Sequence, residues 1–451
     1  MDWETCQGGV ARTMRLQTLS KDEVIKKYLE LEKENEELKK QKEILEKELR
    51  KYKNSNTPPS AHPFFKPAVI LLRNMKGAPL GHVGITRKKN DYGESRIIVA
   101  KNCPNCYSDN IRVLHQKRQQ IEEMPKEIAP KAINVLRDVC HCNKCNLDFI
   151  ARDGRTPIQG KFGVNLMVLV IFLKFIVRGV LRKTSSFLDA SFAMKLAPAS
   201  VHAIIERAAI AGEKEYFALK QKIRDAKLLY VDETSFRVMG KNWWVWVFRS
   251  DTDLLLVIRN SRGNNVLEEI LGKSYAGIIV CDCWRAYDFL TNASIQRCWA
   301  HLLRKSKELN STAGKHFHKK INTLFQEILK FNLKQRTEKQ RQIKYEQMTV
   351  KLQKITKQYS RYQNCEAVVK YINFHLESWF TCIKKAGVQP TNNYAEQAIR
   401  ETVLVRKIIG AFRSEKGTKI YETLASLIAT WQIQKLDIKK ELHRMLTTNL
   451  C

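Results

Sequence analysis

Four apolar, β-prone runs between residues 228 and 284 constrain the fold of this chain more than any other feature. Residues 228–234, 243–248 and 254–258 follow one another closely, and this pattern predicts a meander of three strands. The fourth run, residues 277–284, contains Asp282 near its end, as the first contains Asp232. If the fourth strand pairs beside the first, the two carboxylates share one site.

A third acid lies far from these strands in the sequence. Glu396 belongs to the string PTNNYAEQAIR at residues 390–400, where Thr391 or Asn392 is the expected N-cap of a helix. Helical spacing then places Asn392, Glu396 and Arg400 on one face. We therefore expect Asn392 and Arg400 to support the function of Glu396.

Three converging carboxylates repel one another unless cations lie between them. Hard oxygen ligands select Mg²⁺ or Mn²⁺, and two such ions suit in-line displacement at a phosphodiester. At these points of the chain, Asp232, Asp282 and Glu396 are similar to the acids of a ribonuclease-H-like nuclease. The expected fold class is α/β with such a catalytic core. The alternative is that the aspartates are turn residues at strand ends and the glutamate is a solvated helix residue.

The composition favours a folded protein with a nucleic-acid partner. The chain has 451 residues, of which 44% are hydrophobic, and this allows several domains with at least one sizeable core. Lys and Arg number 79 against 46 Asp and Glu, for a formal net charge of +33, as expected of a protein that binds DNA. A ribosome-associated protein or one on an anionic membrane would carry a similar charge.

The sequence predicts neither export nor membrane insertion. Residues 1–20 have no apolar core of signal-peptide length, and the longest apolar run, 164–177, is broken by Lys174 and followed by Arg178. We therefore expect a buried helix there, and a cytoplasmic, nucleoid-associated protein without a membrane partner. The 12 cysteines are expected to be thiols or metal ligands rather than a disulfide framework.

The N-terminal part predicts a dimerisation helix followed by a linker. After a tail at residues 1–20, residues 21–53 predict a coiled coil, in which Asn35 favours a parallel homodimer and Lys42 weakens the seam. A single solvated helix is the alternative. Residues 54–100 predict a basic linker, whose GHVGITR string ends at Arg87, a candidate DNA contact. The repeat that supports the coiled coil has one large residue at every seventh position: Val24, Leu31, Leu38, Leu45 and Tyr52.

Residues 101–150 predict a zinc-binding DNA module. Cys103 and Cys106 form one Cys-x-x-Cys pair and Cys142 and Cys145 a second, so that four thiolates can hold one structural, tetrahedral Zn²⁺. Cys140 and His141 compete as ligands beside the second pair, and a redox role or unliganded thiols are the alternative interpretations. Basic residues between the pairs are candidate phosphate contacts: Arg112, Lys117 and Arg118.

Helical patterns surround the predicted strands. Within a helical region at residues 160–220, residues 185–192 and 199–209 have the outline of a helix-turn-helix, which any packed helical hairpin shares. Residues 225–301 predict the first part of the catalytic core, and residues 302–387, rich in Lys, Gln and Glu, predict a helical insertion. Residues 388–451 predict the end of the core and C-terminal helices.

These motifs together resemble the insertion-sequence-66 family of bacterial and archaeal transposases. The resemblance covers most of the chain and rests on VDET at residues 231–234, Asp282 with Tyr287, CWAH at 298–301 and, most specifically, TNNYAE at 391–396. It implies a DDE recombinase with a helical insertion in its catalytic domain and a zinc-binding DNA module in front. The metal ligands that it implies are Asp232, Asp282 and Glu396. The DNA contacts expected from the family's tail are Arg406 and Lys407.

The CWAH string contains His301, in a Cys-x-x-His element similar to one in transposases with helical insertions. We expect His301 to support the active site by orienting a phosphate or a metal-bound water, and a hydrogen-bonded core histidine is the alternative. Gln397 stands where the family commonly has arginine, a departure that weakens a DNA contact without touching the metal chemistry.

The expected function is that of a transposase. It binds the ends of its own element, cleaves there and joins the freed 3′-hydroxyl to target DNA. Accessory proteins encoded by the element are further candidate partners. The rival hypothesis is a DNA-binding repressor or a domesticated relic without catalysis, against which the complete set of acids argues. A plain ribonuclease-H-like nuclease is a third hypothesis, but it needs neither the cysteine pairs nor the long insertion.

Overall fold

The computed structural model describes residues 130–451, together with residues 30–32, 34–38, 40–41, 43–44, 105, 107–110 and 112. The chain divides into two compact units, Met1–Asn56 with Ala129–Cys451 and Thr57–Ile128. Within residues 30–44, the described residues are helical, and Leu31 and Leu38 are exposed. Dimerisation through this segment stays a prediction. The predicted tail and linker lie outside the described residues.

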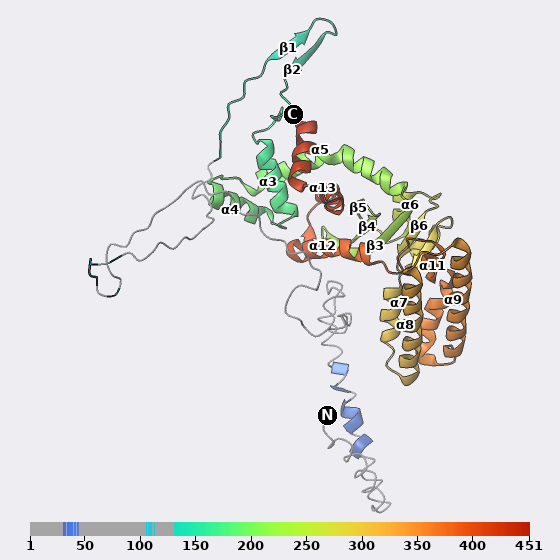
Figure 1. Cartoon of the computed structure of the whole chain (residues 1–451). Helices are drawn as coiled ribbons and strands as arrows, with labels where there is room; N and C mark the ends of the chain where they lie inside the picture. Colours follow the sequence, from blue (N-terminus) through green and yellow to red (C-terminus); the bar gives the residue numbers. More distant parts are fainter. Residues whose placement is uncertain are drawn as a thin grey trace, which may run out of the picture. The chain divides into compact units, whose positions relative to one another are not determined.

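A six-stranded mixed sheet forms the middle of the larger unit (Figure 1). Its strand order is β5-β4-β3-β6-β7, with β8 paired to β3. The meander predicted from the first three apolar runs is confirmed, because β3, β4 and β5 pair antiparallel in that sequence. The fourth run also pairs beside the first, since β6 lies parallel to β3. The strands are β3 (Leu228–Val238), β4 (Lys241–Arg249), β5 (Leu254–Arg259), β6 (Ile278–Cys281), β7 (Ser294–Arg297) and β8 (Ala411–Phe412).

Alternation along the strands divides their side chains between two faces. Val231, Trp246 and Phe248 pack into one hydrophobic core, and Val245 and Val247 pack into another on the opposite face. Helices cover both faces, and the chain therefore has an α/β architecture with a central mixed sheet. The helices that contribute to these two cores are α3 (Val164–Phe175), α4 (Leu181–Phe192), α5 (Pro198–Arg224), α6 (Asn264–Leu271), α12 (Asn393–Ile409), α13 (Glu415–Ile433) and α14 (Ile438–Leu450).

Side chains of α13 cap the outer edge of β5. The backbone N–H groups of Leu254, Leu256 and Ile258 point away from β4, and they donate to Thr430 Oγ1 (3.0 Å), Ser426 Oγ (2.9 Å) and Glu422 Oε1 (2.7 Å). Every second residue of β5 meets every fourth residue of α13, because two residues of a strand advance about 6.7 Å and four residues of a helix advance about 6 Å. The edge strand therefore keeps these donors paired without a further strand.

A helical insertion separates β7 from α12 and has a hydrophobic core of its own. Trp299, Phe317 and Trp379 are buried in this core, which meets the sheet at Tyr230 and Val280. The backbone N–H of Trp299 donates to Pro390 O (3.0 Å), so the start and the end of the insertion lie together. Its helices are α7 (Trp299–Lys307), α8 (Thr312–Asn332), α9 (Glu338–Tyr359), α10 (Glu366–Phe374) and α11 (Thr381–Lys384).

The buried helix predicted for the longest apolar run ends earlier than that run. α3 ends at Phe175, and Arg178 adopts a positive φ of 59°. Gly179 then donates its N–H to Leu173 O (2.8 Å), a bond that closes the end of the helix. A Cβ at Gly179 would lie 3.0 Å from that carbonyl oxygen, so glycine suits the turn. No helix within the described part of the chain is long and apolar enough to cross a membrane.

α5 is longer than the helix predicted at residues 199–209, because it continues to Arg224. Its buried face packs against α13, where Gly212 allows close contact with Thr423 and Leu427. A DNA-binding role for the α4–α5 pair stays a prediction.

Candidate active site

The strand register brings Asp232 and Asp282 to the same level of the sheet. β3 and β6 run parallel, with Leu228 opposite Ile278 and Tyr230 opposite Val280. Asp232 lies two residues further along β3, and Asp282 directly follows the end of β6. The two carboxylates are near enough for the charge of Asp282 to act on Asp232. Trp284 N–H donates to Asp282 Oδ1 (2.8 Å), and Glu233 N–H donates to Asp232 Oδ1 (3.0 Å).

α12 brings Glu396 to this pair. β6 and β8 cover only the two ends of one edge of β3, and α12 spans the interval between them. Asn392, at the N-cap position, donates its Nδ2–H to Val231 O (2.8 Å), directly before Asp232. Glu396 follows in the first turn of the helix. Asn392 is fully buried, so it supports the site by fixing the helix to the strand rather than by capping the helix with its side chain.

The charges of the three acids act on one another. Burial, together with the negative charges of Glu233, Asp282 and Glu396, raises the pKa of Asp232 well above its ordinary value. A cation between the carboxylates would remove this penalty. The site therefore favours either a proton on Asp232 or a bound cation.

Divalent cations fit the donors present. Glu396 Oε1 and Asn392 Oδ1 are both buried and have no hydrogen-bond partner within the described part of the chain. These atoms and the two aspartates are oxygen donors, the type that Mg²⁺ and Mn²⁺ select. A buried acceptor without a partner is costly, and a cation would satisfy it.

His301 and Cys298 lie beside Glu396. Cys298 immediately precedes α7, and its Sγ accepts the N–H of Asn392 (3.1 Å). His301 Nδ1 lies 3.7 Å from Glu396 Oε1, and burial lowers the pKa of His301 below its ordinary value. Arg400, one turn after Glu396, is exposed. His301, expected to support the active site, thus lies next to one of the three acids, and its supporting role stays a prediction.

Sequence reasoning gave no separate role to Glu233, which lies on the other face of the sheet from Asp232. Glu233 Oε1 accepts from Arg262 Nε (2.9 Å), and Glu233 Oε2 accepts from the Tyr287 hydroxyl (2.7 Å). Burial raises the pKa of Glu233, and the negative charge of Asp282 adds to this effect. Its adjacency to Asp232 in the sequence was the only available signal.

Trp284 and Arg297 are two further residues that sequence reasoning did not assign. The Arg262 guanidinium stacks on Trp284 (4.1 Å from the ring centroid), and Trp284 remains 38% exposed. Arg297 is buried and donates to Asp282 O (2.6 Å), so it holds the end of β6 in place. The sequence signal for Trp284 was its position two residues after Asp282, a candidate catalytic acid.

The second cysteine pair lies on a β-hairpin. β1 (Val139–Cys142) and β2 (Leu147–Ile150) pair antiparallel, and the turn between them contains Cys145. Hydrogen bonds from the backbone and side chain of Cys145, and from the backbone of Lys144, lower the pKa of Cys142. Of the competing ligands, His141 Nδ1 lies 2.7 Å from Asp148 Oδ1. Cys103 and Cys106 lie outside the described residues, and zinc binding stays a prediction.

The structure corrects one expected DNA contact. Arg406 is 6% exposed, and its Nη1 donates to Ser235 O and to Thr234 Oγ1. These bonds hold α12 against the part of β3 that pairs with neither β6 nor β8. The Arg406 guanidinium is therefore not a surface cation available to DNA. Lys407 and Arg112 are exposed. The remaining predicted contacts lie outside the described residues: Arg87, Lys117 and Arg118.

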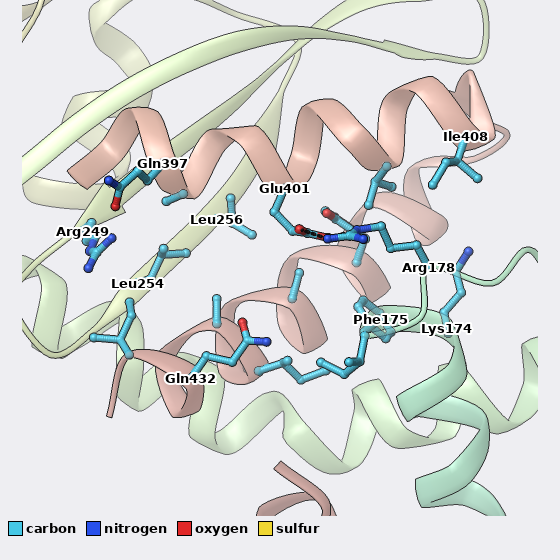
Figure 2. A pocket seen from close by; sticks show the side chains of 18 of the residues that line it. Lys174, Phe175, Arg178, Arg249, Leu254, Leu256, Gln397, Glu401, Ile408 and Gln432 are labelled. Atoms are coloured by element: carbon cyan, nitrogen blue, oxygen red, sulfur yellow. Dashed lines mark hydrogen bonds and ion pairs between the residues drawn. The ribbon is translucent and has the colours of Figure 1, made fainter. Parts of the chain in front are cut away.

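A cavity of about 500 Å³ lies along another face of α12 (Figure 2). Its wall includes Leu254, Leu256 and Phe175, and Arg178 forms a bidentate ion pair with Glu401 there (2.6 and 2.7 Å). None of the three acids lines this cavity. It is separate from the candidate active site.

Two comparisons relate the chain to known proteins. A model of the family described as "Transposase IS66 family" matches residues 159–420, a range that contains all three. The chain is also similar to an uncharacterized protein, y4hP, of Sinorhizobium fredii. The two are 22% identical over 399 residues, which cover 78% of this chain and 71% of that protein.

Proposed function

Since the chain belongs to the IS66 family of transposases, we propose that it cleaves and joins DNA as a DDE recombinase, with Asp232, Asp282 and Glu396 as ligands of two divalent cations. The register between β3 and β6 supports this proposal most directly, because it pairs Tyr230 with Val280, each of which precedes an aspartate by two residues. The fixing of α12 at Val231 adds the third acid. The core would then be ribonuclease-H-like.

Mg²⁺ or Mn²⁺ in this site would supply a more acidic water or 3′-hydroxyl and would stabilise the leaving oxygen. The protein supplies position and charge. Asn392 and Arg406 hold α12 against β3, and Arg297 holds the end of β6, so that the three carboxylates converge. His301, next to Glu396, is placed to orient a phosphate or a metal-bound water.

The net positive charge of the protein would favour the approach of DNA to this site. The net charge of +33 favours phosphate binding without regard to sequence. Trp284 offers an exposed indole beside Asp282, on which a base next to the scissile phosphate can stack. Lys407 and Arg112 are exposed cations available to the DNA backbone.

The other parts of the proposal concern assembly. Residues 21–53 would form a dimer, and Cys103, Cys106, Cys142 and Cys145 would hold one structural Zn²⁺ in a module that binds the element ends. The hairpin of Cys142 and Cys145 supports the second half of that ligand set. The further partners in this proposal are target DNA and accessory proteins encoded by the element. The proposed location is the nucleoid.

Strand transfer by the purified full chain tests the function directly. The substrate is the DNA that flanks its own gene, with Mg²⁺ and a target plasmid. Asp232→Asn, Asp282→Asn and Glu396→Gln are each expected to reduce transfer at least about a hundredfold, because metal ligation is worth several kcal/mol and each 1.4 kcal/mol is about tenfold in rate. Binding to the element ends should change little, since the cationic surface is intact.

Asp251→Asn is the matched control, because Asp251 is exposed in the turn between β4 and β5. It should transfer like the wild type. A wild-type protein that binds the ends but never cuts them would point instead to a repressor or relic. Near-normal transfer by any one of the three variants would remove that residue from the site.

A further inference from the structure

Cys298, His301 and Glu396 form a cluster that differs in chemistry from the pair of aspartates. One ligand atom of each residue lies within 4.8 Å of the other two. His301 Nδ1 and Glu396 Oε1 are 3.7 Å apart. Around a tetrahedral zinc ion, with bond lengths of about 2.0–2.3 Å, ligand atoms lie about 3.3–3.6 Å from one another. Small side-chain movements would bring the three atoms to that spacing.

Two helix starts hold the cluster in shape. Cys298 precedes α7 and His301 lies in its first turn, while Glu396 lies in the first turn of α12. Cys298 Sγ accepts the N–H of Asn392 (3.1 Å), and the backbone N–H groups of Ala300 and His301 also point to it. Burial nevertheless raises the pKa of the Cys298 thiol to about 12, and these donors only partly oppose the rise, so a metal ion bound here displaces the thiol proton.

The donors of this cluster are available. His301 Nδ1 and Glu396 Oε1 are buried atoms without a hydrogen-bond partner in the part of the chain that the structure describes. The His301 and Glu396 side chains are 27% and 21% exposed, whereas Cys298 is fully buried. An ion can therefore enter from the side of His301 and Glu396 and meet the sulfur at the bottom.

We propose that Cys298, His301 and Glu396 bind a divalent transition metal of the zinc type, with the fourth position open to water or a DNA oxygen. Sulfur and imidazole select Zn²⁺, Co²⁺ or Cd²⁺ over Mg²⁺, whose ligands are oxygens. Because the cluster includes Glu396, a zinc ion there competes with the Mg²⁺ site for this carboxylate and inhibits strand transfer. Metal binding stands without the proposed function, but the inhibition rests on it.

Cobalt binding by the full chain tests the site. Co²⁺ is added to protein freed of metal, and two quantities are measured: the thiolate-to-cobalt absorption and the Co²⁺ retained per chain after gel filtration. Cys298→Ser should retain one equivalent fewer than the wild type. Comparing the variant with the wild type cancels the metal held by other cysteines, Cys142 and Cys145 among them. Equal retention by the two proteins overturns the proposal.

Cys365→Ser is the matched control, because Cys365 is also a fully buried free thiol but lies in the helical insertion. It should bind Co²⁺ like the wild type. If Cys298→Ser fails to fold by circular dichroism, His301→Gln serves the same comparison and should also lose one equivalent. Wild-type retention by a folded His301→Gln protein contradicts the site.

Zinc titration of strand transfer in Mg²⁺ tests the inhibition, with each variant compared with its own zinc-free rate. The zinc concentration that halves the rate should be at least about tenfold higher for Cys298→Ser than for the wild type or Cys365→Ser. If the wild type binds the additional Co²⁺ but transfers no DNA, the metal site is supported and the proposed function fails. Transfer with unchanged Co²⁺ retention by Cys298→Ser overturns the metal site alone.

Discussion

Trp284 keeps a large apolar surface in water directly beside Asp282, and its other side is stacked on Arg262. Stacking of a base on such an indole is worth about 1–3 kcal/mol. Trp284→Ala should therefore weaken binding to the element end by about fivefold to 150-fold, and Trp284→Phe should restore most of it. The measurement is the affinity for ends with and without a base at the nucleotide next to the cut.

Phe217→Ala is the control for this variant, since Phe217 is exposed on α5. It should leave affinity unchanged. If Trp284→Ala weakens binding to the abasic end as much as to the intact end, Trp284 does not stack on that base.

His375 gives the stability of the protein a predictable dependence on pH. Burial and the positive charge of Arg297 lower the pKa of His375 to about 4, and Asp288, Arg285 and Asp282 are its other charged neighbours. The unfolded chain takes up this proton near pH 6.5, its ordinary value. Unfolding is thus favoured progressively as the pH falls from about 6.5 to 4.

Thermal melting between pH 7 and 4 checks this dependence. His375→Gln should lose less stability over that interval than the wild type, because its side chain takes up no proton. His443→Gln, at an exposed position on α14, should keep the wild-type slope. Parallel pH curves for His375→Gln and the wild type would assign the acid sensitivity to other groups.

At the scale of elements, the contact between α13 and β5 makes a test of its own. Thr430 Oγ1 accepts from Leu254 N and donates to Leu254 O. Thr430→Val keeps the shape but leaves both backbone groups unpaired, so the free energy of unfolding should fall by about 1–3 kcal/mol. Thr323→Val, at an exposed position of α8, should change it by less than about 0.5 kcal/mol. Equal losses in urea unfolding would mean that the bond to Leu254 adds nothing.

Four strands of the central sheet, β3 to β6, could be predicted because alternating and continuous apolar runs report burial directly. The short strands β7 and β8 have no such run and were not predicted. The register of β6 on β3 then followed from topology rather than from any pairing motif. The burial of Arg406 could not be predicted. A basic residue near the end of a helix is expected to be exposed, and only the gap between β6 and β8 along β3 explains why this one is not. Gly179 was a sequence signal for the end of α3. The apolar residues 176 and 177 made the helix seem to continue past Phe175, so this signal was not used.

The approach of His301 and Cys298 to Glu396 was beyond sequence reasoning for a different reason. The residues lie at the starts of two helices on either side of the insertion, and the bonds from Trp299 N–H to Pro390 O and from Asn392 N–H to Cys298 Sγ join these starts. Local patterns carry no information on such a closure. The expectation of a supporting role for His301 came from a resemblance, and the geometry adds the partner.

For the whole molecule, the N-terminal segment decides the state in solution. A protein that begins at Ser60 should sediment as a monomer without DNA, because an apolar seam at every seventh residue is stable only when paired. The full chain should sediment as a dimer under the same conditions. The core should keep its fold, since in the described part of the chain its hydrophobic clusters use no residue before Phe162. A dimer that survives the truncation would place the interface elsewhere.

Both borders of the central sheet end on helices: α13 covers β5, and Thr381 of the insertion donates to Ile295 O on β7 (2.6 Å). A neighbouring copy therefore finds no row of open N–H groups along β5 on which to add a strand. Copies of this sheet that crowd together would meet at this edge through helix surfaces and charged side chains, contacts that salt and dilution can reverse. High local concentration and resistance to fibril growth are thus compatible in this fold.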